Sequence, residues 1–248
     1  VRRGLAPIGE TLMSRLANED PIFGIDSIPF LAASYEDAGK LWEASRPVVE
    51  EKLAEQGLTL FYAVPWPGQS LYTQEEVEST ADLEGEAFRA YNTATERLAQ
   101  LMGAVPTQIE TGDIPTAFST GRVDAMITSP STGVSSQAWD FVSVFTDIQA
   151  WLPKNMIIVN TRAFEALPDE VQTAVMEAAA SAETRGWEMS SAETAYQIAT
   201  LEENGMTVAA PSDTLSQELA EIGETMTQEW LDEAGEEGQA VIDAYQGE

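Results

Sequence analysis

Short apolar runs alternate with longer segments of helical spacing along most of the chain. Apolar runs bounded by turn residues predict buried strands at Leu58 to Val64, Val123 to Ile127 and Asn155 to Asn160. Ile8 to Leu12 is interpreted as a further strand. Helical spacing with terminal signals predicts helices at Tyr35 to Glu55, Thr95 to Met102 and Ile114 to Thr120. Val1 to Gly4 is interpreted as a helix end, and Glu86 to Asn92 as a further strand. Alternating elements of this kind indicate an α/β layered fold.

The segment from Pro168 to Asn204 favours helix throughout, apart from Gly186. A helix of this length exceeds what one small domain usually needs. We interpret it as a strut that crosses two domains and bends near the glycine. Two ordinary helices that meet at Gly186 fit the pattern equally well.

The residue pattern changes abruptly within the stretch "AFSTGRVDAMITSPS", from Ala117 to Ser131. A helix end with Gly121 as its left-handed cap is followed by a buried strand, which leads directly into small hydroxyl residues. The stretch "RRGLAPIGETLMS" repeats the order of glycine, strand and hydroxyl, as two similar lobes would. Because ligands of open α/β sheets bind outside the carboxyl ends of the strands, Thr128 and Ser129 are predicted to lie on a cleft wall.

Composition excludes several classes of function. The chain has no histidine and no cysteine, which rules out Cys/His zinc sites, thiol nucleophiles and Ser-His-Asp triads. Its 42 acidic and 12 basic residues give a net charge of -30, which argues against nucleic acid and anionic lipid as partners. No apolar run reaches the length of a membrane span, so no membrane insertion is expected. The sequence opens at Val1 without a methionine, and we expect that a signal peptide has been removed.

Several ordered stretches resemble the extracytoplasmic solute-binding proteins of TRAP (tripartite ATP-independent periplasmic) transporters. They are "DSIPFL" with "SYEDA", "DLEGEAFRAYNTAT", "LMGAVPTQI", "AFSTGRVDAMITSP" and "FEALPDEVQTAVMEAA". The resemblance implies a two-lobed periplasmic-binding-protein-like α/β fold with a long helix spanning both lobes. We expect lobe I to comprise residues 1–67 with 154–193, and lobe II residues 68–153 with 194–248. Family members carry a strand-helix-strand segment before the position of Val1, so we expect the sequence to be incomplete there.

The resemblance also implies a function without chemistry or cofactor. A monomeric periplasmic protein would capture a small organic acid between its lobes and deliver it to the TRAP membrane subunits. A binding module that senses the ligand for a signalling partner is an alternative, and a hydrolase or lyase that uses paired carboxylates is another. Because no phosphate loop, nucleophile elbow or metal motif is present, we expect no enzyme activity.

Arg89 is the first candidate for ligand binding. In the family the arginine of this strand holds the ligand carboxylate, which suits a planar guanidinium that donates two parallel hydrogen bonds. A surface ion pair is the alternative reading, both for Arg89 and for Arg15, which stands where some members place a second arginine. Asn92 and Thr95 follow the strand, where they would either meet the anion or cap the next helix.

Departures from the family pattern affect the expected ligand. Thr128 stands where the family has the asparagine of its E-N-P motif, Ile127 replaces the glutamate, and Ser70 stands where several relatives have arginine. With fewer polar groups, the site is expected to favour a smaller or more apolar acid. Thr111 completes the candidate set together with the tryptophans near the predicted cleft edges, Trp66, Trp139 and Trp151, each of which is also a plausible core residue.

Overall fold

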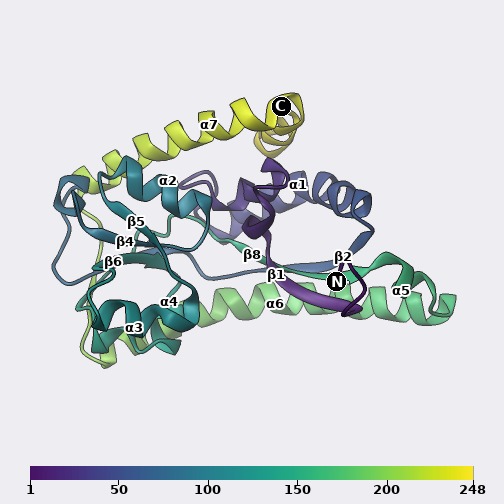
Figure 1. Cartoon of the computed structure of the whole chain (residues 1–248), viewed down its shortest axis with the longest axis horizontal. Coiled ribbons are helices and arrows are strands. Elements are labelled where there is room, and N and C mark those ends of the chain that lie inside the picture. The colour runs from purple at the N-terminus through teal and green to yellow at the C-terminus, as the bar shows by residue number, and fades with distance from the viewer. Residues whose placement is uncertain (248) are drawn as a thin grey trace.

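The computed structural model describes residues 1–247 and places its strands in two separate sheets (Figure 1). The strands are β1 (Ile8–Leu12), β2 (Leu58–Pro65), β3 (Ser70–Thr73), β4 (Ala87–Ala90), β5 (Val105–Gln108), β6 (Ala125–Thr128), β7 (Val144–Thr146), β8 (Lys154–Asn160) and β9 (Thr207–Ala209). The helices are α1 (Tyr35–Glu55), α2 (Thr93–Leu101), α3 (Ile114–Ser119), α4 (Pro130–Ser135), α5 (Thr161–Glu165), α6 (Asp169–Glu203) and α7 (Asp213–Gln246).

The two sheets have different topologies. A three-stranded sheet has the order β1-β8-β2, with β8 antiparallel to both neighbours. A six-stranded sheet has the order β5-β4-β6-β3-β7-β9, in which β4 is parallel to β5 and β6. Because α2 and α3 connect these parallel strands, the carboxyl ends of β4, β5 and β6 lie at one edge of the sheet. The residues that follow the three strands are thereby brought together.

Helix α6 is continuous and contacts both halves of the fold. It packs against β2 of the three-stranded sheet, against β9 of the six-stranded sheet and against α4. Figure 1 shows the helix running along the length of the molecule. The prediction of a strut is therefore confirmed, and the alternative of two helices that meet at Gly186 is wrong. The bend near Gly186 stays a prediction. Gly186 lies where the helix passes close to Val64 of β2.

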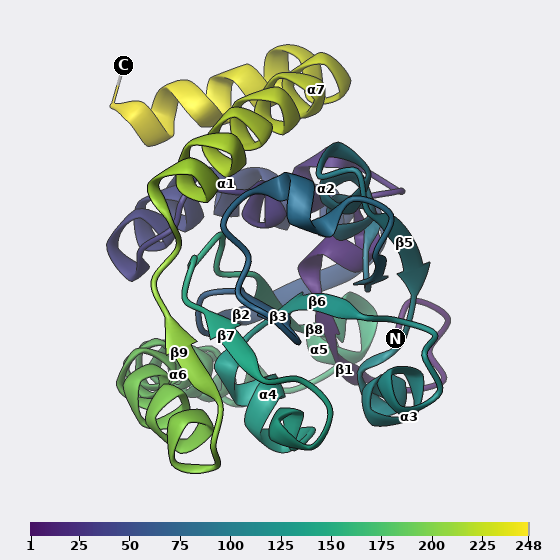
Figure 2. The same cartoon turned by 90° about the vertical axis from the view of Figure 1, so that its left-hand side faces the viewer.

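Helix α7 covers the opposite side of the molecule (Figure 2). Ser212 caps its first turn by accepting a hydrogen bond from the backbone N–H of Leu215 at 2.9 Å. The helix breaks at Gly235, whose φ of 61° and ψ of -144° are not helical. It packs on α1, on α2 and on the 3-10 segment Pro21–Ser27, so it covers elements attached to both sheets.

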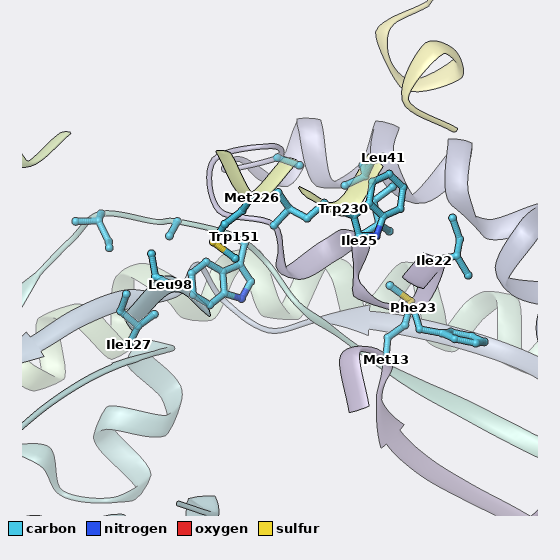
Figure 3. Close-up of a cluster of buried hydrophobic side chains, with 14 of the residues drawn as sticks. Met13, Ile22, Phe23, Ile25, Leu41, Leu98, Ile127, Trp151, Met226 and Trp230 are labelled. Carbon is cyan, nitrogen blue, oxygen red and sulfur yellow. The ribbon is translucent and has the colours of Figure 1, made fainter. Parts of the chain in front are cut away.

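One large apolar cluster connects these elements (Figure 3). It combines side chains from Pro21–Ser27, α1, α2, β6 and α7 with Trp151, which is 1% exposed and lies on the segment that leads from the six-stranded sheet into β8. Trp230 of α7 anchors the helix by donating a hydrogen bond from Nε1 to the Pro21 carbonyl at 2.7 Å. Burial of large aromatic groups at this crossing stabilises the arrangement of the two sheets.

Two sequence predictions need correction, and a third stays open. Val1 to Gly4 is not a helix end, because these residues form a turn that closes with Gly4 at a φ of 71°. The strand predicted for Glu86 to Asn92 is limited to Ala87–Ala90, since Asn92 already caps α2. The strands of residues 1–67 and 154–193 all belong to the three-stranded sheet, whereas the lobe boundaries themselves stay a prediction.

Candidate functional site

A cavity of about 440 Å³ lies between the two sheets. One wall comes from the three-stranded sheet and its flanking turns, and the other from the strand ends of the six-stranded sheet and from α4. The lining residues are Glu10, Thr11, Leu12, Arg15, Trp66, Gln69, Arg89, Tyr91, Glu110, Thr111, Thr128, Ser129, Thr132, Pro153 and Asn155. A cavity of this kind, concave and lined by a few convergent polar groups, is typical of a small-molecule site.

Arg89 is the most deeply buried charged group of the cavity, with 1% of its surface exposed. Its Nε donates to the Ile109 carbonyl at 3.1 Å and its Nη2 to Thr111 Oγ1 at 3.4 Å, while its guanidinium carbon lies 5.0 Å from the centre of the Tyr91 ring. Within residues 1–247 it forms no ion pair, so the alternative reading of a surface ion pair is wrong for this residue. Burial lowers the pKa of Arg89, although the negative charge of Glu110 opposes the shift.

Tyr91 follows β4 directly and helps to fix the floor of the cavity. Its hydroxyl donates to Gln69 Oε1 at 3.1 Å. Burial raises the pKa of Tyr91, with the Arg89 charge acting in the opposite direction, so the phenol is neutral and keeps its proton. A neutral ring beside the guanidinium supports Arg89 without neutralising it.

The hydroxyl residues at the end of β6 form the neighbouring part of this wall. Ser129 caps α4, because its Oγ accepts a hydrogen bond from the Thr132 backbone N–H at 3.1 Å and also donates to Thr132 Oγ1 at 3.1 Å. Both Thr128 and Ser129 line the cavity, as the sequence predicts. The Thr128 side chain makes no hydrogen bond to another residue of the described chain, which leaves its hydroxyl for a ligand.

Arg15 forms an ion pair across the cavity mouth. Its Nη2 lies 2.5 Å from Glu110 Oε2, and the two side chains are 52% and 60% exposed. Arg15 follows β1 of one sheet, whereas Glu110 follows β5 of the other. The structure therefore agrees with both interpretations of Arg15, since the residue lines the cavity and also forms an exposed ion pair.

The three-stranded sheet contributes a hydrogen-bonded row of side chains. Trp66 Nε1 donates to Asn155 Oδ1 at 3.0 Å, and Asn155 Nδ2 donates to Glu10 Oε1 at 2.6 Å. The three residues belong to β1, to β8 and to the turn that follows β2, so the row runs across the whole sheet. It gives this wall an anionic end at Glu10 and an aromatic end at Trp66.

Two predicted site residues lie elsewhere. Ser70 is fully buried outside the cavity lining, where its Oγ donates to Asp147 Oδ1 at 3.2 Å and accepts from the Gln149 backbone N–H at 3.2 Å. Asn92 lines a neighbouring cavity of about 480 Å³, and it forms a capping box with Thr95 at the start of α2. The capping reading is thus confirmed for Asn92 and Thr95.

Of the three tryptophans, only Trp66 lines the main cavity. Trp151 belongs to the large apolar cluster, and Trp139 packs at the edge of a smaller one around Tyr72 and Phe145. Both take the core role that the sequence left open. The lining residues that sequence reasoning missed are Glu10, Thr11, Leu12, Gln69, Tyr91, Glu110, Thr132, Pro153 and Asn155. For Tyr91 the signal was its position at the carboxyl end of a buried strand.

The described residues carry neither a metal cluster nor a membrane helix. No group of three or more acidic side chains in residues 1–247 could hold a metal ion. In the same part of the chain, none of the helices combines the length and the apolar character that crossing a bilayer requires.

The two sheets, the helix that contacts both and the cavity between them define a two-lobed solute-binding protein. The family model of bacterial extracellular solute-binding proteins, family 7 (DctP), matches residues 1–234, and the chain belongs to this family. A solute-binding protein of Albidiferax ferrireducens is 22% identical over 188 residues, which make up 74% of this chain and 55% of that protein. The chain thus spans little more than half the length of that relative.

Solved structures resemble the chain more closely. DctP7 of Bordetella pertussis, an extracytoplasmic solute receptor binding pyroglutamic acid, is 50% identical with a TM-score of 0.98, over 99% of this chain and 82% of that chain. DctP6 of the same organism, also binding pyroglutamic acid, is 40% identical with a TM-score of 0.98, over 100% of this chain and 82% of that chain. A marine metagenome TRAP solute-binding protein specific for pyroglutamate is 40% identical with a TM-score of 0.97, over 100% of this chain and 82% of that chain.

Proposed function

We propose that this protein is the periplasmic solute-binding subunit of a TRAP transporter and that its ligand is a small organic acid, with pyroglutamate as the first candidate. The observation that carries the proposal is Arg89, a buried cation in the cavity without an anionic partner in residues 1–247. Burying an unpaired charge is costly, and a ligand carboxylate removes that cost by pairing with it.

The geometry of Arg89 suits a carboxylate. Its Nε and Nη2 are held by the Ile109 carbonyl and Thr111 Oγ1, which fixes the plane of the guanidinium. Its Nη1 makes no hydrogen bond to the described residues and is free to donate. A carboxylate can therefore approach the Nη1 and Nη2 edge, where an arginine donates two parallel hydrogen bonds.

The remainder of the cavity suits a small and partly apolar acid. Leu12, Trp66 and Tyr91 offer apolar surface for a ring, and Thr128 offers a free hydroxyl. Pyroglutamate combines a carboxylate with a lactam, whose carbonyl can accept from Thr128. Two neighbours at 40% and 50% identity bind pyroglutamic acid, which supports the same choice here.

The transport role follows from the family rather than from the cavity. Lining residues from both sheets let a bound acid contact both walls, and closure of the walls would enclose it. We propose that the closed form then meets the TRAP membrane subunits in the periplasm. Binding without chemical conversion is sufficient for this role.

Calorimetry with the purified chain tests the proposal. Pyroglutamate should bind, and Arg89→Ala should weaken binding by about 30-fold or more, the range for truncating one partner of a buried charge pair. Arg89→Lys should recover only part of the loss, because an ammonium cannot reproduce the two-pronged contact. Arg162→Ala is the matched control, since Arg162 is exposed on α5 and lies outside the cavity.

Circular dichroism of each variant would separate loss of binding from loss of folding. Near-parent affinity in a correctly folded Arg89→Ala protein would contradict the assignment of Arg89. Absence of binding by the parent chain to pyroglutamate and to a panel of other carboxylates would contradict the proposed function as a whole.

A further inference from the structure

The charged side chains of the main cavity are unevenly paired. Arg15 and Glu110 form an ion pair with each other. Arg89 and Glu10 have no oppositely charged partner among residues 1–247, although both line the same cavity. They come from opposite walls, since Arg89 lies on β4 of the six-stranded sheet and Glu10 on β1 of the three-stranded sheet. The cavity thus presents one unpaired cation and one unpaired anion to a ligand that reaches both walls.

Glu10 is held in place by its neighbours. Its Oε1 accepts the 2.6 Å hydrogen bond from Asn155 Nδ2, and the Asn155 amide is itself oriented by the hydrogen bond that Trp66 Nε1 donates to Oδ1. The amide therefore cannot turn its oxygen toward Glu10 without losing both contacts. Oε2 of Glu10 forms no hydrogen bond within the described chain and remains an acceptor.

We propose that Glu10 is a specificity-determining residue that accepts a hydrogen bond from a ring nitrogen of the ligand. The inference rests on the proposed function: Arg89 holds the carboxylate of the acid, and Glu10 selects acids that carry an N–H on the side facing β1. The ligand class is thereby narrowed from small organic acids to cyclic acids with a nitrogen-bound hydrogen, either a lactam or a ring ammonium.

Electrostatics favours a ligand with a ring N–H over one with a ring oxygen at this position. An N–H that meets Oε2 forms a charge-assisted hydrogen bond, which is roughly twice as strong as a neutral one. A ring oxygen in the same place presents lone pairs to a carboxylate, and leaves Glu10 without its donor after water has been displaced. Sites that recognise a polar hydrogen reject the analogue lacking it far more strongly than apolar sites reject a change of size.

A comparison of matched ligands tests the role of Glu10. The probes are pyroglutamate, its lactone counterpart with ring oxygen in place of the N–H, cyclopentanecarboxylate with neither group, and proline with a ring ammonium. The parent protein should prefer pyroglutamate over the lactone by on the order of 100-fold in Kd. If proline binds as well as pyroglutamate, Glu10 accepts a hydrogen bond from either a ring ammonium or a lactam N–H. If only pyroglutamate binds, Glu10 recognises the lactam N–H alone.

The variant Glu10→Gln supplies a readout that a merely structural role would not change. Its amide keeps an oxygen for Asn155 and offers an NH₂ to a ring oxygen, so the lactone should bind more tightly and pyroglutamate about 10-fold more weakly. The preference between the two should therefore nearly vanish. Glu86→Gln removes the same charge from an exposed site just before β4, outside the cavity, and should leave the preference unchanged.

The outcomes distinguish the two proposals. Equal binding of lactam and lactone by the parent protein, or an unchanged preference in Glu10→Gln, would overturn the role of Glu10 while the binding of acids through Arg89 stands. Failure of the parent protein to bind any of the four probes would contradict pyroglutamate binding and the role of Glu10 together.

Discussion

Gly186 in the middle of α6 lies so close to Val64 of β2 that a Cβ atom on the glycine would come within 2.5 Å of Val64 Cγ2. Real Cβ atoms do not approach carbon this closely, so the glycine permits the contact between the long helix and the three-stranded sheet. The helix continues through this position without a break. Gly186 is therefore a packing residue, and its place in a helix-favouring stretch reflects a tertiary requirement.

Gly186→Ala should destabilise the protein despite the higher helix propensity of alanine. The propensity gain is about 1 kcal/mol, whereas overpacking against a strand costs typically about 1–3 kcal/mol. The expected result is a lower midpoint in urea denaturation. Adding Val64→Ala to the same protein should recover part of the loss, because it removes the methyl group that the new Cβ meets.

Gly39→Ala provides the control for this prediction. Gly39 lies within α1, and a Cβ there would sit 3.9 Å from Trp187 Cζ3, an ordinary van der Waals distance. The same substitution should therefore stabilise at this site, by up to about 1 kcal/mol. Equal effects of alanine at the two glycines would show that close packing at Gly186 is not what limits stability.

A buried ion pair lies where the chain enters β8. Lys154 Nζ is 3.6 Å from Asp26 Oδ2, both side chains are 1% exposed, and Asp26 Oδ2 also accepts from the Lys154 backbone N–H at 2.7 Å. Burial raises the pKa of Asp26 and lowers that of Lys154, and each charge opposes the shift of the other. Lys154→Met should cost about 3–5 kcal/mol, because it leaves a buried carboxylate without its cation.

The pH dependence of Lys154→Met follows from Asp26. Without the lysine, the pKa of Asp26 lies still further above the ordinary 3.8, so the folded state holds this proton while the unfolded state releases it. Stability should therefore fall as pH rises from 3.8 through the folded pKa. In the double variant with Asp26→Asn this slope should be absent and the stability closer to the parent; a retained slope would assign it to another group.

Arg97 of α2 and Glu229 of α7 form an exposed ion pair. We expect its contribution to stability to have the opposite pH dependence. Arg97 Nε donates to Glu229 Oε2 at 2.9 Å and Nη2 to Oε1 at 2.5 Å, which lowers the pKa of Glu229 from its ordinary 4.5. Its contribution is present above 4.5 and is lost as pH falls through the folded pKa. Since both side chains are more than a third exposed, it amounts to at most about 1 kcal/mol.

Urea titrations of the parent and of Glu229→Gln at a series of pH values isolate this contribution, because the remaining carboxylates titrate in both proteins. The difference in unfolding free energy should be largest near neutral pH and should disappear at the acid end. A difference that does not change with pH would mean that Glu229 acts by packing rather than by charge.

Local patterns were sufficient to predict much of the fold. Tyr35–Glu55 was predicted at its observed bounds, because Ser34 caps it, apolar residues recur at helical spacing and Gln56-Gly57 end it. The strands β1, β2, β6 and β8 were also predicted, with shifts of a few residues at their ends. The break of α7 at Gly235 carries no comparable signal, since a glycine within a helix-favouring run also occurs in the unbroken α6.

The candidate site was predictable only where it follows strand ends. Arg89, Thr128 and Ser129 stand in or directly after apolar runs, and the parallel sheet brings these positions together. Glu10 is an exposed position of the short strand β1, so from the sequence it resembles an ordinary solvent-facing residue until β8 places Asn155 beside it. Long-range pairing of this kind is absent from any local window.

The last prediction concerns Glu110, which competes with a ligand for positive charge. Glu110 is paired with Arg15, and its charge also acts on the pKa of Arg89, so its field reaches both arginines of the cavity. Glu110→Gln should free Arg15 and remove a repulsive charge, and pyroglutamate should bind about threefold to tenfold more tightly in low salt. The gain should shrink in about 1 M salt, where the screening length is near 3 Å. Calorimetry at both ionic strengths measures the change in Kd, with Glu86→Gln as the charge-matched control. Weaker binding by Glu110→Gln would mean that the ion pair is needed to shape the cavity.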